Sequence, residues 1–250
     1  MSILDLSPHY FYRTAENQSL PKNKYLEFES NRNLESRRAL FEQVLRKYLD
    51  RDQTVLDYGC GPGYLAWWVS TAVSQVWACD ISRGVLACAK VVNSANNIHY
   101  LRVDKRGIPV PDGCVDFIYS FAVIQHVTDE VFKKLLAEWH RVLKPGGRVF
   151  VHIVVDDPKW ESEEEWRSDR TFGGRAKWML GLHCFGRKSR DVRSWIRQAG
   201  FEDPIVGMVG ELAPDLRDDV AAQNYFEFSK RPADGVRKNE PVEMSVFGQN

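Results

Sequence analysis

Apolar runs and amphipathic stretches alternate along most of this chain. From 34 to 49, apolar residues recur on one face of a helical wheel with charged residues opposite them, which predicts a helix. Asn33 can cap this helix, and we expect it to pack on a sheet just before the first strand. Mainly apolar runs of strand length follow at 54–57, 75–79, 98–103 and 115–120.

The amphipathic stretches between and after these runs predict helices. Ser82 is placed to cap a helix through Ala95, and Thr128 or Asp129 to cap a second helix that stops at the turn 144–147. Their expected buried faces consist of Val85, Leu86, Ala89 and Val92, and of Val131, Phe132, Leu135, Leu136, Trp139, Val142 and Leu143. After a fifth strand, another helix and two last strands are expected at 189–199, 204–209 and 224–229. This alternation predicts an α/β fold built on a parallel sheet.

The stretch VLDYGCGPGYLAWW, residues 55–68, lies where the first strand meets the next helix. Apolar strand residues run into Asp57 and then into a turn with glycine at every second position, namely Gly59, Gly61 and Gly63. Because glycine lets the backbone turn tightly and lets a ligand approach it closely, this stretch predicts a nucleotide-type cofactor site.

The spacing of these glycines distinguishes two classes of cofactor. Dinucleotide-binding turns read G-x-G-x-x-G and direct helix N–H groups at a pyrophosphate, whereas this turn reads G-x-G-x-G and contains Pro62. Asp57 would repel a pyrophosphate and favour a ligand that carries amino or cationic groups. The pattern therefore disfavours NAD.

Charge and cysteine content narrow the class of protein. Lys plus Arg and Asp plus Glu both number 34, so the formal net charge is 0 and nothing indicates a nucleic-acid surface. The five scattered cysteines form no C-x-x-C pair, which predicts reduced thiols and no metal site. No stretch approaches 18 consecutive apolar residues and the first residues lack a signal-peptide pattern, so we expect a cytoplasmic protein.

Three stretches carry a resemblance to a known family. D-x-G-x-G-x-G at 57–63 resembles motif I of the class I S-adenosylmethionine-dependent methyltransferases, in particular the UbiE-like, type 11 domain. IPVPDGCVDFIYSFAVIQHV at 108–127 resembles the family stretch LPFPDGSFDLVxSxxVLxHV, and LKPGGRVFVHIVV at 143–155 resembles the turn and fifth strand that follow it. The resemblance implies a Rossmann-like, doubly wound sheet of seven strands in the order 3-2-1-4-5-7-6, with strand 7 antiparallel.

S-adenosylmethionine is the cofactor that the resemblance implies. Motif I would surround its amino acid end, Asp80 would bind the ribose hydroxyls, and Asp104 with Lys105 would bind adenine. Asp80 could instead cap the following helix, and Asp104 could be a turn residue. The full expected set is Asp57, Tyr58, Gly59, Cys60, Gly61, Gly63, Asp80, Ile81, Asp104, Lys105, Ser120, Phe121 and Gln125.

The expected reaction is methyl transfer to a small-molecule acceptor on oxygen, nitrogen or carbon. Such a displacement depends chiefly on positioning, but a hydroxyl acceptor would gain from a base, for which His126 is the expected residue. The family stretch often has a histidine at this place without a catalytic role. Two other functions stay open: a protein that binds S-adenosylmethionine without transfer and acts as a regulator or partner, and, disfavoured by the turn, a nicotinamide oxidoreductase.

The chain is expected to divide into three parts. Residues 1–33 would form an N-terminal cap in which Tyr10 and Tyr12 cover the cofactor or anchor the segment, and residues 231–250 a flexible tail. Between them, 34–230 would form the methyltransferase domain. Its least regular segment, 156–188, follows the fifth strand, so we expect either an acceptor lid or an insertion that only covers the core.

Overall fold

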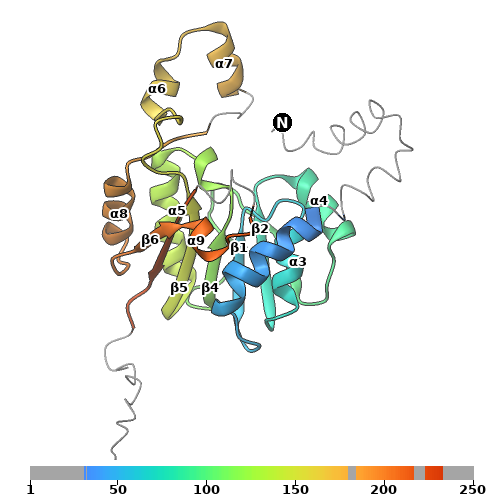
Figure 1. Cartoon of the computed structure of the whole chain (residues 1–250). Coiled ribbons are helices and arrows are strands. Elements are labelled where there is room, and N and C mark those ends of the chain that lie inside the picture. The colour runs from blue at the N-terminus through green and yellow to red at the C-terminus, as the bar shows by residue number, and fades with distance from the viewer. Residues whose placement is uncertain (1–30, 32, 180–183, 217–222, 233–250) are drawn as a thin grey trace, which may run out of the picture.

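A single seven-stranded sheet forms the centre of the protein (Figure 1). The computed structural model describes residues 31, 33–179, 184–216 and 223–232. The strand order is β3-β2-β1-β4-β5-β7-β6, as predicted. The strands are β1 (Thr54–Tyr58), β2 (Gln75–Asp80), β3 (Ile98–Arg102), β4 (Val115–Ser120), β5 (Leu143–Ile153), β6 (Ile205–Met208) and β7 (Asn224–Ser229).

Strand direction also agrees with the prediction. β1 to β5 pair in parallel, whereas β7 runs antiparallel to both β5 and β6. The order reverses between β1 and β4, so the carboxyl ends of these two strands flank the point where ligands bind in open α/β sheets. The register places Asp57 of β1 beside Tyr119 of β4.

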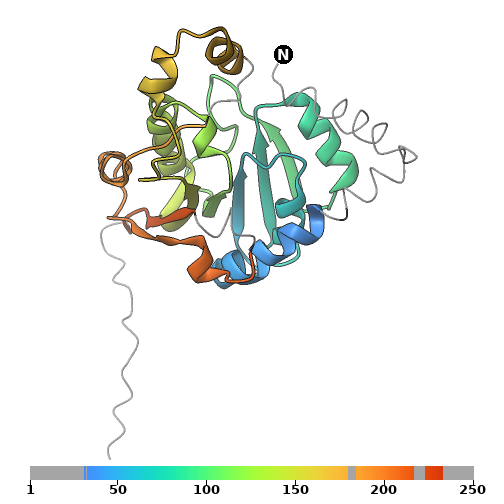
Figure 2. The same cartoon turned by 45° about the horizontal axis from the view of Figure 1, so that its top comes forward.

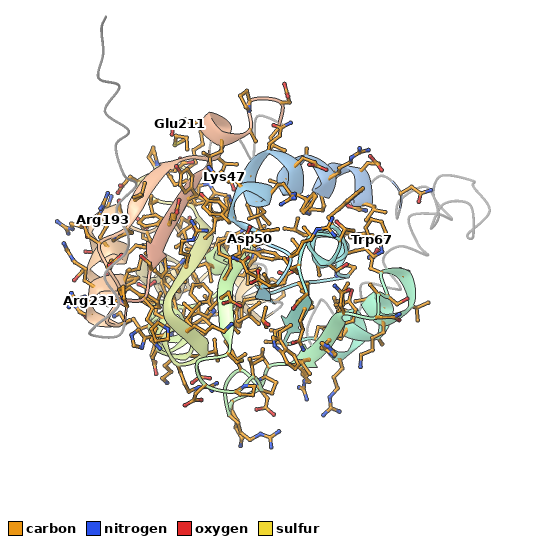
Figure 3. All side chains as sticks on the ribbon, turned by 90° about the horizontal axis from the view of Figure 1, so that it is seen from below. Lys47, Asp50, Trp67, Arg193, Glu211 and Arg231 are labelled. Carbon is orange, nitrogen blue, oxygen red and sulfur yellow. The ribbon has the colours of Figure 1, made fainter. Side chains whose placement is uncertain are left out.

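Helices cover both faces of the sheet, and each face has its own apolar cluster. Seen from below in Figure 3, side chains fill both layers, with the labelled Trp67 and Arg193 on opposite sides. One face carries α5 (Asp129–Val142) and α8 (Ser189–Gln198). The other carries α3 (Tyr64–Ser70), α4 (Arg83–Val92), α9 (Val209–Leu212) and a helix over 33–40 that continues as η2 (Phe41–Leu45) and η3 (Arg46–Tyr48).

The predicted caps and buried faces are mostly confirmed. The hydroxyls of Ser82 and Thr128 accept from the backbone N–H groups three residues on, at 3.3 Å in both cases. Val92 and Val131 are wrong as buried residues, because they lie in the last turn of α4 and the first turn of α5 and are 49% and 45% exposed. Asn33 is also wrong as a cap, since residues 31 and 33 are already helical.

The segment after β5 forms a separate protrusion. Its two helices, α6 (Glu163–Ser168) and α7 (Phe172–Met179), lie together at the top of Figures 1 and 2, beyond the end of β5. A capping box between Ser162 and Glu165 starts α6. We call residues 156–188 the lid segment. Tyr10, Tyr12 and most of the expected cap and tail lie outside the described residues, and no described helix has the length and apolarity needed to cross a bilayer.

Candidate functional site

The glycine turn joins β1 to α3 at the carboxyl edge of the sheet. The backbone N–H groups of Gly59 and Cys60 both donate to the carbonyl of Cys79 at the end of β2, at 2.7 and 3.0 Å. The glycines at 59, 61 and 63 all have positive φ, between 53° and 81°. The turn is thereby held against β2 in a backbone conformation that favours glycine.

The three glycines differ in what surrounds them. A Cβ on Gly59 would lie 2.2 Å from Val123 Cγ2, and one on Gly63 would lie 2.2 Å from the Tyr100 hydroxyl oxygen. A Cβ on Gly61 would meet nothing within 4 Å. Packing within the protein therefore requires the outer two glycines, while Gly61 leaves open space beside the backbone that a ligand can approach.

Asp80 links this turn to the next helix. Its Oδ2 accepts from the Gly61 N–H at 3.0 Å, and its Oδ1 accepts from the Ser82 N–H at 2.9 Å. The side chain is 8% exposed. Ser82 caps α4, so the helix-capping alternative for Asp80 is wrong; the carboxylate instead binds the N–H groups of Gly61 and Ser82 and places its negative charge beside the open side of the turn. Ile81, the next residue, is 57% exposed at the same edge.

Asp57 is a buried carboxyl at the end of β1. It is 3% exposed, its Oδ2 has no hydrogen-bond partner, and the neighbouring Tyr119 hydroxyl makes no bond of standard geometry. Burial raises the pKa of Asp57 to about 7, an effect that the Tyr119 hydroxyl opposes and the Asp80 charge strengthens. Arg37, from the helix before β1, lies near enough for its charge to lower this pKa. A cationic ligand group would stabilise the ionised form.

Asp104 and Lys105 follow β3, at the outer side of the sheet. Asp104 accepts from the Arg106 backbone at 2.8 Å and pairs with its guanidinium at 2.8 Å. These bonds lower the pKa of Asp104 to about 2. Lys105 is exposed. Asp104 is thus an ionised carboxylate on a turn beyond β3, one strand away from Asp80.

Ser120 and Tyr58, two of the expected cofactor residues, contact other residues of the protein through their side chains. The fully buried Ser120 donates its hydroxyl to the carbonyl of Tyr58 at 2.8 Å, which ties the ends of β4 and β1 together. The Tyr58 ring packs edge-on to Trp139 of α5, with centroids 5.8 Å apart. Both side chains thus have a partner within the protein at the point where β1 and β4 end.

The loop after β4 has an unusual conformation. Ala122 has a φ of 58°, a value that non-glycine residues rarely adopt. His152 of β5 is 1% exposed, accepts from the Ala122 N–H through Nδ1 at 3.2 Å, and stacks on Phe121 with centroids 4.9 Å apart. Burial lowers the pKa of His152 to about 4, against a smaller opposing effect of Gln223. His152 is therefore a neutral support for this loop.

The short helix η4 (Ile124–His126) carries Gln125, which was expected at the cofactor, and His126, the expected base. Gln125 is 7% exposed and its Oε1 has no hydrogen-bond partner, whereas His126 is exposed. Cys184 of the lid segment places its Sγ 3.4 Å from His126 Nδ1. The next residue, Phe185, donates its N–H to the Gln125 carbonyl at 2.7 Å. The structure thus brings the lid segment onto both residues.

Residues 56–151 match the model of a methyltransferase domain, and the strand order around them is that of the class I fold. These residues form a methyltransferase domain with the class I fold. The methyltransferase domain spans all of the expected cofactor residues, from motif I to the loop after β4. The Oδ2 of Asp57, which has no hydrogen-bond partner, and the open side of Gly61 fit the amino acid end of S-adenosylmethionine.

Known methyltransferases resemble this chain in sequence over less than half of its length and in structure over most of it. The malonyl-[acyl-carrier protein] O-methyltransferase of Pectobacterium atrosepticum is 32% identical over 113 residues, 45% of this chain and 43% of that protein. The chain thus spans less than half the length of this relative. An S-adenosylmethionine-dependent methyltransferase from Mesorhizobium loti, 20% identical, superposes with a TM-score of 0.58 over 77% of this chain and 98% of that chain.

The structure of a third similar protein contains S-adenosylhomocysteine. Phosphoethanolamine N-methyltransferase 2 of Haemonchus contortus, in complex with phosphomonomethylethanolamine and S-adenosylhomocysteine, has a TM-score of 0.55 and 18% identity over 81% of this chain and 53% of that chain. At this identity the likeness concerns the fold alone.

Several residues of the site had no sequence signal. Arg37, Tyr119 and Cys184 belong to elements far apart in the chain and reach the site only through tertiary contacts. His152 lies inside the mainly apolar strand β5. For His152 and Tyr119, the sequence indicated a special role only through a polar group within a mainly apolar strand.

Proposed function

We propose that this protein transfers the methyl group of S-adenosylmethionine to a small-molecule acceptor. The observation that carries the proposal is a buried carboxyl group at Asp57, whose Oδ2 has no hydrogen-bond partner, beside an unobstructed glycine at Gly61, both at the carboxyl edge of β1. Burying an ionised carboxylate without a charged partner costs free energy, and a bound ammonium group would offset that cost.

The cofactor would be held by residues from three neighbouring strands. Asp57 offers a negative charge to the ammonium group, the Gly61 backbone lets the amino acid end approach, and Asp80 lies beside the turn for the ribose. Asp104 and Lys105 lie one strand further out, toward adenine. The bound cofactor supplies a methyl group on a sulfonium, so the leaving group is already activated.

The protein's own part in the reaction would be to place the acceptor. Gln125 and His126 face the lid segment on η4, and the lid carries Cys184 against the imidazole. For a hydroxyl acceptor, His126 would act as the base, in the tautomer that keeps the ring proton on Nδ1 toward Cys184 and accepts at Nε2.

Calorimetry tests the cofactor half of the proposal. The purified protein is titrated with S-adenosylhomocysteine and, separately, with NAD. We expect saturable binding of S-adenosylhomocysteine and none of NAD. Binding of NAD alone would end the methyltransferase proposal.

A screen with methyl-labelled S-adenosylmethionine tests the transfer half. Phenols, amines, carboxylic acids and acyl-carrier-linked carboxylates are the acceptor classes, the last because a relative is named for such a substrate. Transfer to one class would identify the acceptor atom. Binding of the cofactor without transfer to any class would favour the regulatory alternative instead.

Once an acceptor is known, His126→Ala tests the base. General-base catalysis typically contributes about 10²- to 10⁴-fold, so a loss below about threefold across pH would remove this role from His126. The activity of the parent protein on the same acceptor is the reference.

A further inference from the structure

Arg187 is a buried cation at the end of the lid segment. Arg187 is 6% exposed. Its guanidinium carries five N–H donors, which need hydrogen-bond partners inside the protein when water is excluded. Nη1 donates to the carbonyl of Ile124 at 3.0 Å, and Nη2 donates to the carbonyl of Val127. These two carbonyls lie at the first residue of η4 and just after its last, so one guanidinium holds both ends of this helix.

The charge of Arg187 is compensated at the same place. Nε donates to Asp129 Oδ1 at 2.8 Å, and the rings of Phe132 and Phe185 lie 5.6 and 5.8 Å from the guanidinium carbon. Glu163 of the lid segment accepts from the Asp129 N–H at 2.7 Å. The Arg187 side chain is 2% exposed and that of Asp129 37%, so loss of Asp129 would leave a buried cation without its charge partner.

The residues before Arg187 contact the same helix from the same side. Phe185 is fully buried and bonds through its N–H to Gln125, and the Cys184 thiol meets the His126 ring. Gly186 donates to the Glu161 carbonyl at 2.8 Å, which returns the chain to the start of the lid. Residues 184–187 therefore form a continuous strap across η4, with Arg187 as its only cation.

We propose that Arg187 is a positioning residue that fixes η4 and, through it, the side chains of Gln125 and His126. Its role in methyl transfer rests on the proposed function, whereas its role in holding η4 rests on these contacts alone. Two bonds to carbonyls and one to a carboxylate require a planar fork of donors, which lysine lacks. No other described residue donates to both ends of η4.

Alkylation of Cys184 reports on the strap without any acceptor. Arg187→Ala and the parent are treated with iodoacetamide at pH 8, and the modification of each cysteine is followed by mass spectrometry. Because charged hydrogen bonds are lost, we expect Cys184 to react at least about tenfold faster in the variant. The buried Cys60 and Cys79 should keep their rates.

Chemical rescue separates positioning from general destabilisation. Guanidinium chloride at a non-denaturing, low millimolar concentration should return the Cys184 rate of Arg187→Ala to within about threefold of the parent, whereas methylammonium chloride should not. Arg190→Ala is the matched control, because this arginine lies three residues on with its side chain 84% exposed, and it should behave as the parent.

Two results would overturn the assignment. One is an unchanged Cys184 rate in Arg187→Ala; the other is a rise at Cys60 and Cys79 as well, without rescue by guanidinium. If Arg187→Ala does not fold, Asp129→Asn takes its place, because this variant removes only the charge partner of Arg187. An unchanged alkylation rate of Cys184 in Asp129→Asn would also overturn the role assigned to Arg187.

Binding of S-adenosylhomocysteine, measured on the same samples, keeps the two proposals apart. Arg187→Ala should still bind and should lose less affinity than Gly61→Ala, because Arg187 contacts η4 and α5 and not the glycine turn. A parent that fails to bind would refute the proposed function and leave the alkylation result to decide the role of Arg187.

Discussion

His152 Nδ1 accepts the backbone N–H of Ala122 at 3.2 Å, and Ala122 has a φ of 58°. A neutral imidazole in the fifth strand thereby holds a strained residue in the loop after the fourth. Strain of this kind persists only where the surroundings determine it, and it gathers at functional sites. In the same loop, Phe121 stacks on His152 and Val123 approaches Gly59 of the glycine turn.

Two substitutions of His152 should separate its hydrogen bond from its ring. His152→Asn keeps an acceptor near the position of Nδ1, so the affinity for S-adenosylhomocysteine should stay within about twofold of the parent. His152→Phe keeps the ring but leaves the Ala122 N–H unpaired, at a cost of about 1 kcal/mol, so the affinity should fall about fivefold. Calorimetry at pH 7.5 measures both. Equal affinities for the two variants would contradict the role of this bond.

Gly61→Ala should remove cofactor binding, and its cost to folding should be only that of an alanine at positive φ. The added methyl meets no protein atom, so it projects into the space proposed for the cofactor. We expect at least a tenfold loss of S-adenosylhomocysteine affinity. Gly113→Ala is the matched control, because Gly113 has a φ of 59° and equally open surroundings on a distant turn. Similar melting temperatures for the two variants, with a loss of binding only in Gly61→Ala, are the expected result.

Asp57→Asn should stabilise the protein at alkaline pH. The folded-state pKa of about 7 lies above the ordinary value of 3.8, so the folded state binds the extra proton and the free energy of unfolding falls as pH rises between these values. Asparagine removes this loss. The variant should melt about 5 °C or more above the parent at pH 8, with little difference at pH 4. A lower melting temperature at pH 8 would contradict the burial argument.

The same carboxyl should make cofactor binding depend on pH. A bound ammonium favours the ionised form of Asp57, so binding releases a proton at pH values below about 7. The affinity for S-adenosylmethionine should therefore rise between pH 5.5 and about 7 and then level off. Calorimetry in buffers of different ionisation enthalpy measures both the affinity and the released proton. Asp57→Asn, the control, should bind weakly and without this pH dependence.

Asp104 and Arg106 form a pair that distinguishes an adenine contact from a turn. If Asp104 contacts the adenine amino group, Asp104→Ala should lose about tenfold in affinity for S-adenosylhomocysteine, since bonds to charged groups contribute about 1.5–3 kcal/mol. Arg106→Ala removes the partner on the turn and should stay within about threefold. Equal losses in the two variants would assign Asp104 to the turn alone.

Much of the fold could be predicted from periodicity and turn chemistry. The runs at β1, β2 and β4 matched their strands to within one residue, and Ser82 and Thr128 cap the helices that they were expected to cap. These features depend on residues close together in the chain. Val92 and Val131 were misjudged, because a helical wheel does not show where a helix passes beyond the sheet that it covers.

The site was predictable only where a local motif carries the chemistry. Motif I, Asp80 and the loop after β4 lie directly after strands, so their common edge follows from the parallel sheet. The hydrogen bonds that these side chains make at that edge could not be predicted from the sequence. Ser120, expected beside the cofactor, bonds to the Tyr58 carbonyl, and Asp80 bonds to Gly61 and Ser82, because backbone groups brought together by folding need partners.

By itself, the sequence determined the fold class of this protein, with its parallel sheet in a known strand order, and a glycine spacing that differs from the dinucleotide-binding pattern. Tertiary structure alone decided which glycine is open, why Asp57 keeps its proton to about pH 7, and how Arg187 reaches η4. Motifs are encoded by neighbours in the chain. Burial, charge compensation and contact between residues 63 positions apart exist only once the chain has folded.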